Sequence, residues 1–283
     1  MERFDRNIRF FGEAGQQILS ESIVAVLGCG GLGQHVIQQL AFLGVQKIIV
    51  IDDEDLSETN LNRYVLARFD DPIPGTTKVD IVRRGVALIN PDITVIPVHA
   101  ELRSKAAFET LASADVIFGC LDNDGARLIL NEFSLAYSKD LFDLASDTES
   151  KEILRYGGRV AYVGQDVGCL VCMDLLDLKS AAEDLASDEN RQDRAKIYGI
   201  EVSDLAKTGP SVVSLNGIIA SLAVTEYMLH VTGIRQAKHK LEYRGNLGIV
   251  STQKHIGFDD CYYCKTIKNI GNKANLDRFI IQG

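Results

Sequence analysis

A glycine-rich turn is the first feature of this sequence that can do chemistry. Residues 28–33 read Gly-Cys-Gly-Gly-Leu-Gly and match G-x-G-x-x-G, directly after an apolar run over 22–28 and before a helical pattern over 32–43. In this context glycines let backbone N–H groups approach a phosphate at the start of a helix. The expected phosphate-binding residues are Gly28, Gly30, Gly31 and Gly33. The pattern fits NAD and ATP equally, and a tight turn without a ligand would also show it.

An acidic residue follows the next apolar run. Asp52 ends the expected strand over 47–51, about twenty residues after the glycine turn, where a carboxylate accepts hydrogen bonds from both ribose hydroxyls of a nucleotide. This position again fits either nucleotide. The acids at 53–55 are expected to lie in a solvated loop.

Two cations and a further acid favour ATP over NAD. Arg63 and Lys78 can stabilise the charge that develops when pyrophosphate leaves a triphosphate, whereas a dehydrogenase has no such task for them. Asp122 follows the expected strand over 115–120, at the edge of the sheet where ligands bind, and can hold Mg²⁺. The alternatives are two surface cations and a helix cap. We expect Asp124 to be the cap of the helix beginning near Gly125.

Two C-x-x-C pairs can form a metal site. They supply four thiolates with the geometry of a closed tetrahedral zinc site, although a long stretch of chain separates them. Two unrelated buried pairs, or a redox C-x-x-C, are the alternatives. The expected ligands are Cys169, Cys172, Cys261 and Cys264.

The elements that must position these residues alternate between strands and helices. Helices are expected over 32–43, 78–88 and 105–111, and strands over 22–28, 47–51, 93–98 and 115–120. The strand segments are continuous apolar runs, which is typical of strands buried on both faces. The sequence therefore predicts an α/β, Rossmann-like fold with a mostly parallel sheet covered by helices.

The pattern changes after residue 140. Short strand-like segments at 141–145, 159–163, 240–244 and 247–251 predict that the sheet continues into an antiparallel half. The polar stretch 174–207 has no strong apolar period and is expected to be a mobile crossing segment over the active site. A helix over 211–230 is expected to follow Gly209-Pro210.

Composition narrows the class of protein. The net charge of −9 disfavours nucleic-acid binding, which is driven by clustered cations. The N-terminus shows no signal peptide, and Asn216 and Glu226 interrupt the most apolar stretch, so we expect no membrane span and a cytoplasmic location. In that reducing compartment the six cysteines favour metal binding or redox chemistry over disulfides.

The combination of motifs resembles the superfamily of ubiquitin-activating enzymes and their bacterial relatives, the molybdopterin-synthase and thiamine sulfur-carrier adenylyltransferases. The resemblance runs along nearly the whole chain. Residues 4–8 match an opening Tyr-x-Arg-Gln-Ile-like segment, and residues 60–63 match Asn-Leu-x-Arg, after the shared glycine loop. Tyr64 and Asn7 stand where the family usually has Gln, so contacts around the phosphates are expected to differ.

The resemblance implies a role for each matching residue. Arg6 is implied to reach the ATP phosphates of a partner subunit, which makes a homodimer the expected assembly. Asn60, Arg63 and Lys78 are implied to contact the phosphates, while Asp52 holds the ribose and Asp122 the Mg²⁺. A structural Zn²⁺ on the four cysteines is implied to tether the chain's end to the crossing segment.

The implied organisation is one adenylation domain. It comprises an N-terminal arm (1–21) that carries Arg6, a nucleotide-binding part (22–140), and an antiparallel half (141–283) with the crossing segment and the zinc site.

The expected activity is Mg-ATP-dependent adenylation of the C-terminal Gly carboxylate of a ubiquitin-like or sulfur-carrier protein ending in Gly-Gly. Relatives with a covalent intermediate place a Cys in the crossing segment, but no Cys occurs from Met173 to Asp260. The enzyme is therefore expected to stop at the adenylate, with Cys29 and Cys120 as packed residues. The alternatives are adenylation of a small peptide or of a carboxylate on a modified tRNA base, an NAD-dependent Rossmann oxidoreductase, and a non-catalytic scaffold.

Overall fold

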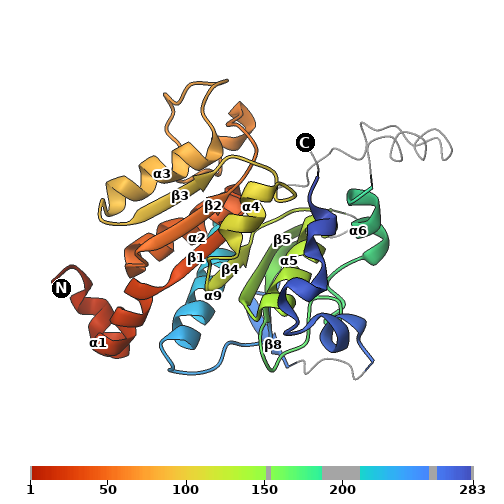
Figure 1. Cartoon of the computed structure of the whole chain (residues 1–283). Helices are drawn as coiled ribbons and strands as arrows, with labels where there is room; N and C mark the ends of the chain where they lie inside the picture. The colour runs from red at the N-terminus through yellow and green to blue at the C-terminus, as the bar shows by residue number, and fades with distance from the viewer. Residues whose placement is uncertain (1, 151–153, 187–210, 255–259, 282–283) are drawn as a thin grey trace.

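An eight-stranded sheet with the order β3-β2-β1-β4-β5-β6-β7-β8 runs through the molecule (Figure 1). The computed structural model describes residues 2–150, 154–186, 211–254 and 260–281. The strands are β1 (Ile23–Leu27), β2 (Lys47–Ile51), β3 (Thr94–Val98), β4 (Val116–Gly119), β5 (Asp140–Ser150), β6 (Leu154–Val163), β7 (Lys240–Arg244) and β8 (Ile249–Gln253).

The sheet changes direction at β5. Strands β3, β2, β1, β4 and β5 pair in parallel, whereas β5, β6, β7 and β8 pair in antiparallel fashion. This confirms the predicted Rossmann-like sheet that continues into an antiparallel half. The segments predicted at 141–145 and 159–163 are the apolar parts of longer strands.

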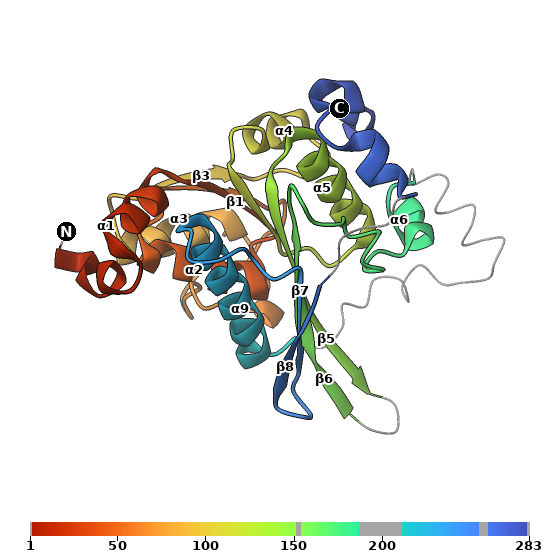
Figure 2. The same cartoon turned by 90° about the horizontal axis from the view of Figure 1, so that it is seen from below.

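Helices cover both faces of the sheet. Figure 2 shows α2 and α9 on one face and α4 and α5 on the other. The helices are α1 (Asp5–Glu21), α2 (Gly31–Leu43), α3 (Lys78–Ile89), α4 (Lys105–Leu111), α5 (Asp124–Tyr137), α6 (Leu178–Asp184) and α9 (Val213–Val231). Short turns are η1 (Glu2–Phe4), η2 (Glu58–Asn60), η3 (Tyr263–Ile267), η4 (Gly271–Ala274) and η5 (Leu276–Phe279).

The core lies between the sheet and these helices. Strands β1 and β2 are buried along nearly their whole length, as expected for continuous apolar runs. Phe118 on β4 stacks on Phe142 of β5 at 5.3 Å between ring centroids, and Tyr227 of α9 meets Phe118 edge-on at 5.6 Å. These contacts fix β4, and therefore the residues that follow it, against the neighbouring strand and helix.

The polar stretch after the sheet reverses is partly helical. Residues 178–184 form α6, and the Asp177 carboxylate accepts hydrogen bonds from the N–H groups of Lys179 and Ser180 at its start. This helix lies within the predicted crossing segment, whose position over the active site stays a prediction. Residues 187–207 and Gly209-Pro210 lie outside the described part of the chain. In the described residues no helix is long and apolar enough to cross a membrane.

Candidate functional site

The glycine turn lies at the carboxyl edge of the parallel strands. Gly28 directly follows β1 with φ +86°, and a Cβ there would lie 2.5 Å from the carbonyl oxygen of Cys120. A Cβ on Gly33 would lie 1.8 Å from the carbonyl oxygen of Gly28, so α2 starts in direct contact with the strand end. Gly30 precedes α2 without a side-chain cap. The first N–H groups of α2 are therefore available to an anion.

Asp52 holds the glycine turn from the end of β2. One carboxylate oxygen accepts a hydrogen bond from the Cys29 N–H at 2.6 Å, and the other accepts one from the Glu54 N–H at 2.9 Å. The side chain is only 8% exposed. Burial raises the pKa of Asp52, and the nearby charge of Lys78 partly offsets that effect. Each oxygen retains a lone pair for a hydroxyl, which fits the expected contact with a ribose.

Lys78 is a buried cation at the start of α3. Its residue is 5% exposed, and Nζ lies 3.9 Å from Asp52 Oδ1 and forms an ion pair with Glu54. Burial lowers the pKa of Lys78, but the charge of Asp52 and the hydrogen bond to Glu54 raise it by more, so the net pKa is raised. Thr77 caps the helix by accepting from the Asp80 N–H. Lys78 is thus a fixed positive charge beside the glycine turn.

Arg63 follows the short turn η2. The Asn60 side-chain oxygen accepts hydrogen bonds from Ser57 N at 3.0 Å and Ser57 Oγ at 2.9 Å, which orders the segment. The half-buried Arg63 donates to the Thr59 carbonyl and, at 3.1 Å, to Asn62 Oδ1. Both contacts are to neutral oxygens next to it in the chain. The guanidinium charge therefore remains available to phosphates.

The aromatic ring of Tyr64 is close to both cations. Arg63 Cζ is 5.5 Å and Lys78 Nζ 5.6 Å from its ring centroid, both within range of a cation–π contact. The nearest atom to a Cβ placed on Gly30 would be the Tyr64 hydroxyl, at 3.6 Å. The sequence showed that Tyr64 replaces a Gln, but gave it no position. The structure places it against the glycine turn.

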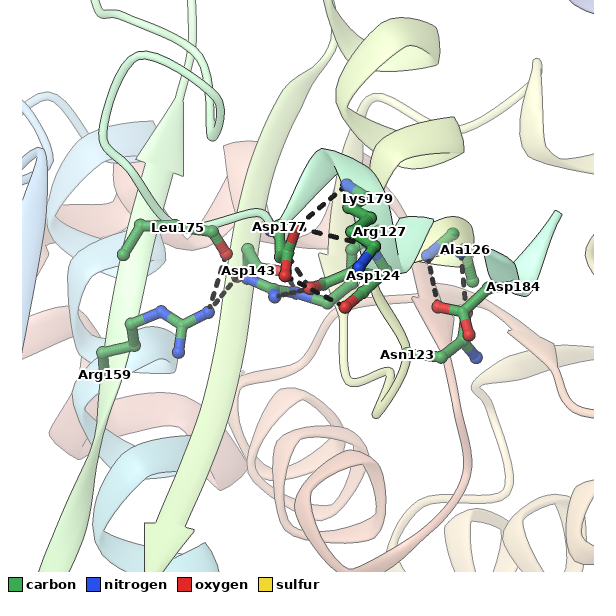
Figure 3. A network of polar contacts seen from close by, with 12 residues as sticks. Asn123, Asp124, Ala126, Arg127, Asp143, Arg159, Leu175, Asp177, Lys179 and Asp184 are labelled. Carbon is green, nitrogen blue, oxygen red and sulfur yellow. Dashed lines mark hydrogen bonds and ion pairs between the residues drawn. The ribbon is translucent and has the colours of Figure 1, made fainter. Parts of the chain in front are cut away.

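Asp122 lies in the turn between β4 and α5. It is exposed, and within the described ranges its carboxylate has no hydrogen-bond partner. The helix cap is Asn123, whose side-chain oxygen accepts from the Ala126 N–H at 2.8 Å, so the prediction that Asp124 caps the helix is wrong. Asp124 instead accepts from Arg127 at 2.7 Å and from the Asp177 N–H at 3.1 Å (Figure 3). Asp122 remains free to bind a cation.

A buried ion-pair network supports that turn. Arg127 of α5 donates to both oxygens of Asp143 on β5, at 2.9 and 2.6 Å (Figure 3). Asp143 is 1% exposed and Arg127 is 6% exposed. This pair was not predicted from the sequence, although an Asp inside the apolar run of β5 indicates a buried partner cation.

Asn216, which interrupts the most apolar stretch of the sequence, also lies at the glycine turn. It is 1% exposed on α9, and its Nδ2 would lie 2.3 Å from a Cβ on Gly31. Nδ2 donates to Ser211 Oγ at 3.0 Å, while Oδ1 is buried without a partner in the described structure. A side chain at position 31 would therefore displace the Asn216 amide, and Asn216 brings an unpaired acceptor to the turn.

Arg6 lies far from these residues. Phe4, just before α1, packs against Gly44 at the end of α2, and α1 also contacts the end of α9 through Gly15 and Thr232 (Figure 1). The glycine turn is at the other end of α2. That helix has 13 residues, a length of about 20 Å. The structure thus brings Arg63 and, through Asp52, Lys78 to the turn. Asn60 orders the segment before Arg63, and the Arg6 of the same chain is not part of this group.

The two C-x-x-C pairs meet in space. All four Sγ atoms lie within 4.8 Å of one another, with separations of 3.7 Å for Cys169–Cys172, 3.7 Å for Cys169–Cys261 and 3.6 Å for Cys172–Cys264. Four sulfurs around Zn²⁺ at about 2.3 Å would be separated by about 3.8 Å. A hydrogen bond from Cys169 lowers the pKa of Cys264 to about 5. The donor set fits a closed zinc site.

The two remaining thiols belong to the core beside the turn. Cys29 is 0% exposed, and burial is the main cause that raises its pKa. Burial also raises the pKa of Cys120, with a further contribution from the charge of Asp143. Both thiols therefore stay protonated at neutral pH, which fits packed residues rather than nucleophiles.

Comparisons with known proteins agree with this geometry. The family model described as "ThiF family" matches residues 4–257. The chain is 37% identical over 134 residues to the SAMP-activating enzyme E1 of Haloferax volcanii (47% of this chain, 49% of that protein). It is 38% identical over 133 residues to the molybdopterin-synthase adenylyltransferase of Salmonella typhimurium (46% and 53%). The chain thus spans about half the length of the curated relatives it matches.

A solved structure shares the fold. The crystal structure of E. coli MccB with ATP superposes with a TM-score of 0.71 at 20% identity, covering 93% of this chain and 74% of that one. At this identity the likeness supports the architecture: a parallel sheet that continues into antiparallel strands.

Proposed function

The chain belongs to the ThiF family, and from this premise we propose that it is a Mg-ATP-dependent adenylyltransferase. Its substrate is the C-terminal Gly carboxylate of a ubiquitin-like or sulfur-carrier protein ending in Gly-Gly. Two relatives are named for such activities, a SAMP-activating E1 and a molybdopterin-synthase adenylyltransferase. A neighbour of the same fold was crystallised with ATP.

The observation that carries the proposal is the charge arrangement around the glycine turn. Lys78 is buried and fixed by Asp52 and Glu54, and Arg63 contacts the same Tyr64 ring that Lys78 contacts. A dinucleotide has only two phosphate charges, which the start of α2 can meet alone. Two further cations suit a triphosphate whose leaving pyrophosphate accumulates charge.

The chemistry needs positioning rather than proton transfer. The substrate carboxylate is ionised at neutral pH and attacks the α-phosphorus in line, so no general base is required. Arg63 and Lys78 stabilise the charge on the leaving pyrophosphate, and Asp52 orients the ribose. Asp122 would hold Mg²⁺, which neutralises phosphate oxygens when bound.

A second copy of the chain completes the site in this proposal. Phe4, two residues before Arg6, packs at the end of α2 that is opposite the glycine turn, and this helix is about 20 Å long. Arg6 is exposed on α1 and has no ion-pair partner among the described residues. An exposed arginine at that edge fits a role in the site of a homodimer partner.

The cysteines divide between structure and packing. The cluster of four thiols would hold a structural Zn²⁺, because all four coordination positions are filled by protein. The pKa values of the Cys29 and Cys120 thiols are raised, which disfavours a nucleophilic role for either. No Cys that could form a covalent intermediate occurs from Met173 to Asp260. The enzyme accordingly releases its product as the acyl-adenylate for capture by another protein.

ATP–pyrophosphate exchange with purified Gly-Gly proteins tests the proposal. Exchange should require the partner protein, and Arg63→Ala, Lys78→Ala and Asp122→Ala should each lower it more than about 100-fold. Arg68→Ala, an exposed arginine of the same loop, is the matched control and should retain the wild-type rate. Exchange driven by a short peptide or a carboxylated tRNA base alone would support those alternative substrates instead. Hydride transfer with NAD and no exchange would support an oxidoreductase.

A further inference from the structure

Arg159 on β6 is an incompletely paired cation close to the proposed site. Its side chain is 23% exposed, and Nη2 donates to the Leu175 carbonyl at 3.3 Å (Figure 3). Nε is buried and has no hydrogen-bond partner in the described part of the chain. A guanidinium has five N–H donors, and leaving buried donors unpaired costs free energy.

The neighbouring acid does not satisfy Arg159. Asp143 Oδ2 is 3.9 Å from Arg159 Nη2, beyond hydrogen-bond distance, and both oxygens of Asp143 already accept from Arg127. Burial lowers the pKa of Arg159, and the positive charge of Arg127 lowers it further. The positive charge of Arg159 is therefore less well neutralised by nearby carboxylates than the charge of Arg127, which Asp143 pairs directly.

The Arg159 side chain lies at an open depression of the surface. It has a volume of about 450 Å³ and is lined by Arg159 and residues 174–178. Asp174 and Asp177 are exposed in this lining, and with Asp143 they disfavour an acidic ligand. A neutral acceptor, such as a main-chain carbonyl, pairs with the guanidinium without repulsion from these carboxylates.

The position of Arg159 matches the path of an extended chain. Strand β5 separates β4 from β6, so the two strands are about 10 Å apart, two strand spacings. Gly119 is in register with Asp143, while Arg159 pairs with Ala145, two residues further towards the edge that carries Asp122. An extended peptide rises about 3.3 Å per residue. A tail whose carboxylate reacts near Asp122 would therefore pass Arg159 about three residues earlier.

We propose that Arg159 binds the substrate tail through a main-chain carbonyl about three residues before the reacting carboxylate. This inference rests on the proposed function, because it takes the ligand to be an extended peptide that ends at the nucleotide. Recognition of the main chain does not depend on which side chain precedes the terminal Gly-Gly. Arg159 acts on the substrate directly, and its bond to Leu175 keeps the guanidinium in the lining of the depression.

A double-mutant cycle with a synthetic decapeptide ending in Gly-Gly tests the contact. Binding to the full chain, saturated with a non-hydrolysable ATP analogue, is measured by calorimetry. The second ligand is the same peptide with an E-alkene in place of the amide whose carbonyl lies three residues before the end. Wild type should bind the alkene peptide at least about tenfold more weakly, because a hydrogen bond to a charged donor is lost.

The variants separate a tail contact from a structural role. In Arg159→Gln both peptides should bind with equal, weakened affinity, while Arg155→Gln, an exposed arginine of the same strand, should behave as wild type. Arg159→Lys, which keeps the charge without the planar fork, serves if Arg159→Gln does not fold. The inference would be overturned if the Arg159 variants still bound the alkene peptide as much more weakly than the amide peptide as wild type does. Two other results would also overturn it: a loss of peptide affinity in Arg155→Gln equal to that in Arg159→Gln, or no peptide binding by wild type. Pyrophosphate exchange by wild type is scored separately, so the proposed function can stand when this inference fails.

Discussion

Removal of the Arg127 guanidinium should destabilise the fold through one buried carboxylate. In Arg127→Met, Asp143 would lose two hydrogen bonds of 2.9 and 2.6 Å while remaining 1% exposed. Breaking a buried ion pair by deleting one partner typically costs 3–5 kcal/mol. Arg159 is 3.9 Å from Asp143 and can move closer, so we expect the lower end of that range, about 3 kcal/mol.

Chemical denaturation followed by circular dichroism gives the free energy of unfolding for each member of a cycle. Asp143→Leu alone leaves Arg127 buried without its main partner and should also cost about 3 kcal/mol. The double variant Arg127→Met/Asp143→Leu removes both charges and should cost at least about 2 kcal/mol less than the sum of the single variants. Arg155→Met is the exposed control and should change stability by less than about 0.5 kcal/mol. Additive losses would show that the pair is not coupled and would refute this reasoning.

Three further predictions concern the metal sites and acid stability. Purified wild-type protein should contain one Zn²⁺ per chain and Cys261→Ser much less, with a lower melting temperature; zinc-free wild type would contradict the assignment. Asp122→Asn should raise the Mg²⁺ concentration for half-maximal pyrophosphate exchange more than about tenfold; an unchanged magnesium dependence would exclude Asp122 as the ligand. Arg84 lowers the pKa of Asp71 below its ordinary value of 3.8, so their pair stabilises the fold above that pH and is lost as pH falls through the lowered pKa. The stability advantage of wild type over Asp71→Asn, about 2 kcal/mol at neutral pH, should therefore shrink below pH 3.8; a constant difference would contradict it.

Local sequence signals predicted the elements of the nucleotide half closely. The predicted bounds of β2 and α4 coincide with the observed Lys47–Ile51 and Lys105–Leu111. Each combines a clear apolar pattern with polar or glycine residues at its ends. The predicted strands were shorter than the observed β5 and β6. Strand β5 continues to Ser150, and β6 begins at Leu154. Their extra residues pair with each other beyond the core, where burial imposes no apolar pattern.

Sequence reasoning located the site through one rule of topology. Parallel strands end at the same edge, so residues after β1, β2 and β4 had to converge. The structure shows Asp52 in contact with the turn and Lys78 beside Asp52, and it places Asp122 after β4. The rule cannot assign hydrogen-bond partners within a turn, which is why Asp124 was wrongly taken as the helix cap.

Interactions between elements that are far apart in the chain could not be predicted from the sequence. Asn216 touches the glycine turn only because α9 packs beside α2, and Arg159 faces Arg127 only because β6 folds back along β5. Neither residue has a local pattern that indicates its partner. Tertiary packing alone creates the depression beside Arg159.

Calorimetric binding of Mg-ATP and of NAD to wild type and Arg63→Met is the most direct test of a triphosphate site at the glycine turn. We expect wild type to prefer Mg-ATP over NAD, and Arg63→Met to bind Mg-ATP at least about tenfold more weakly. Arg68→Met should bind as wild type does. Preference for NAD, or an unchanged affinity of Arg63→Met for Mg-ATP, would contradict the assignment of this site.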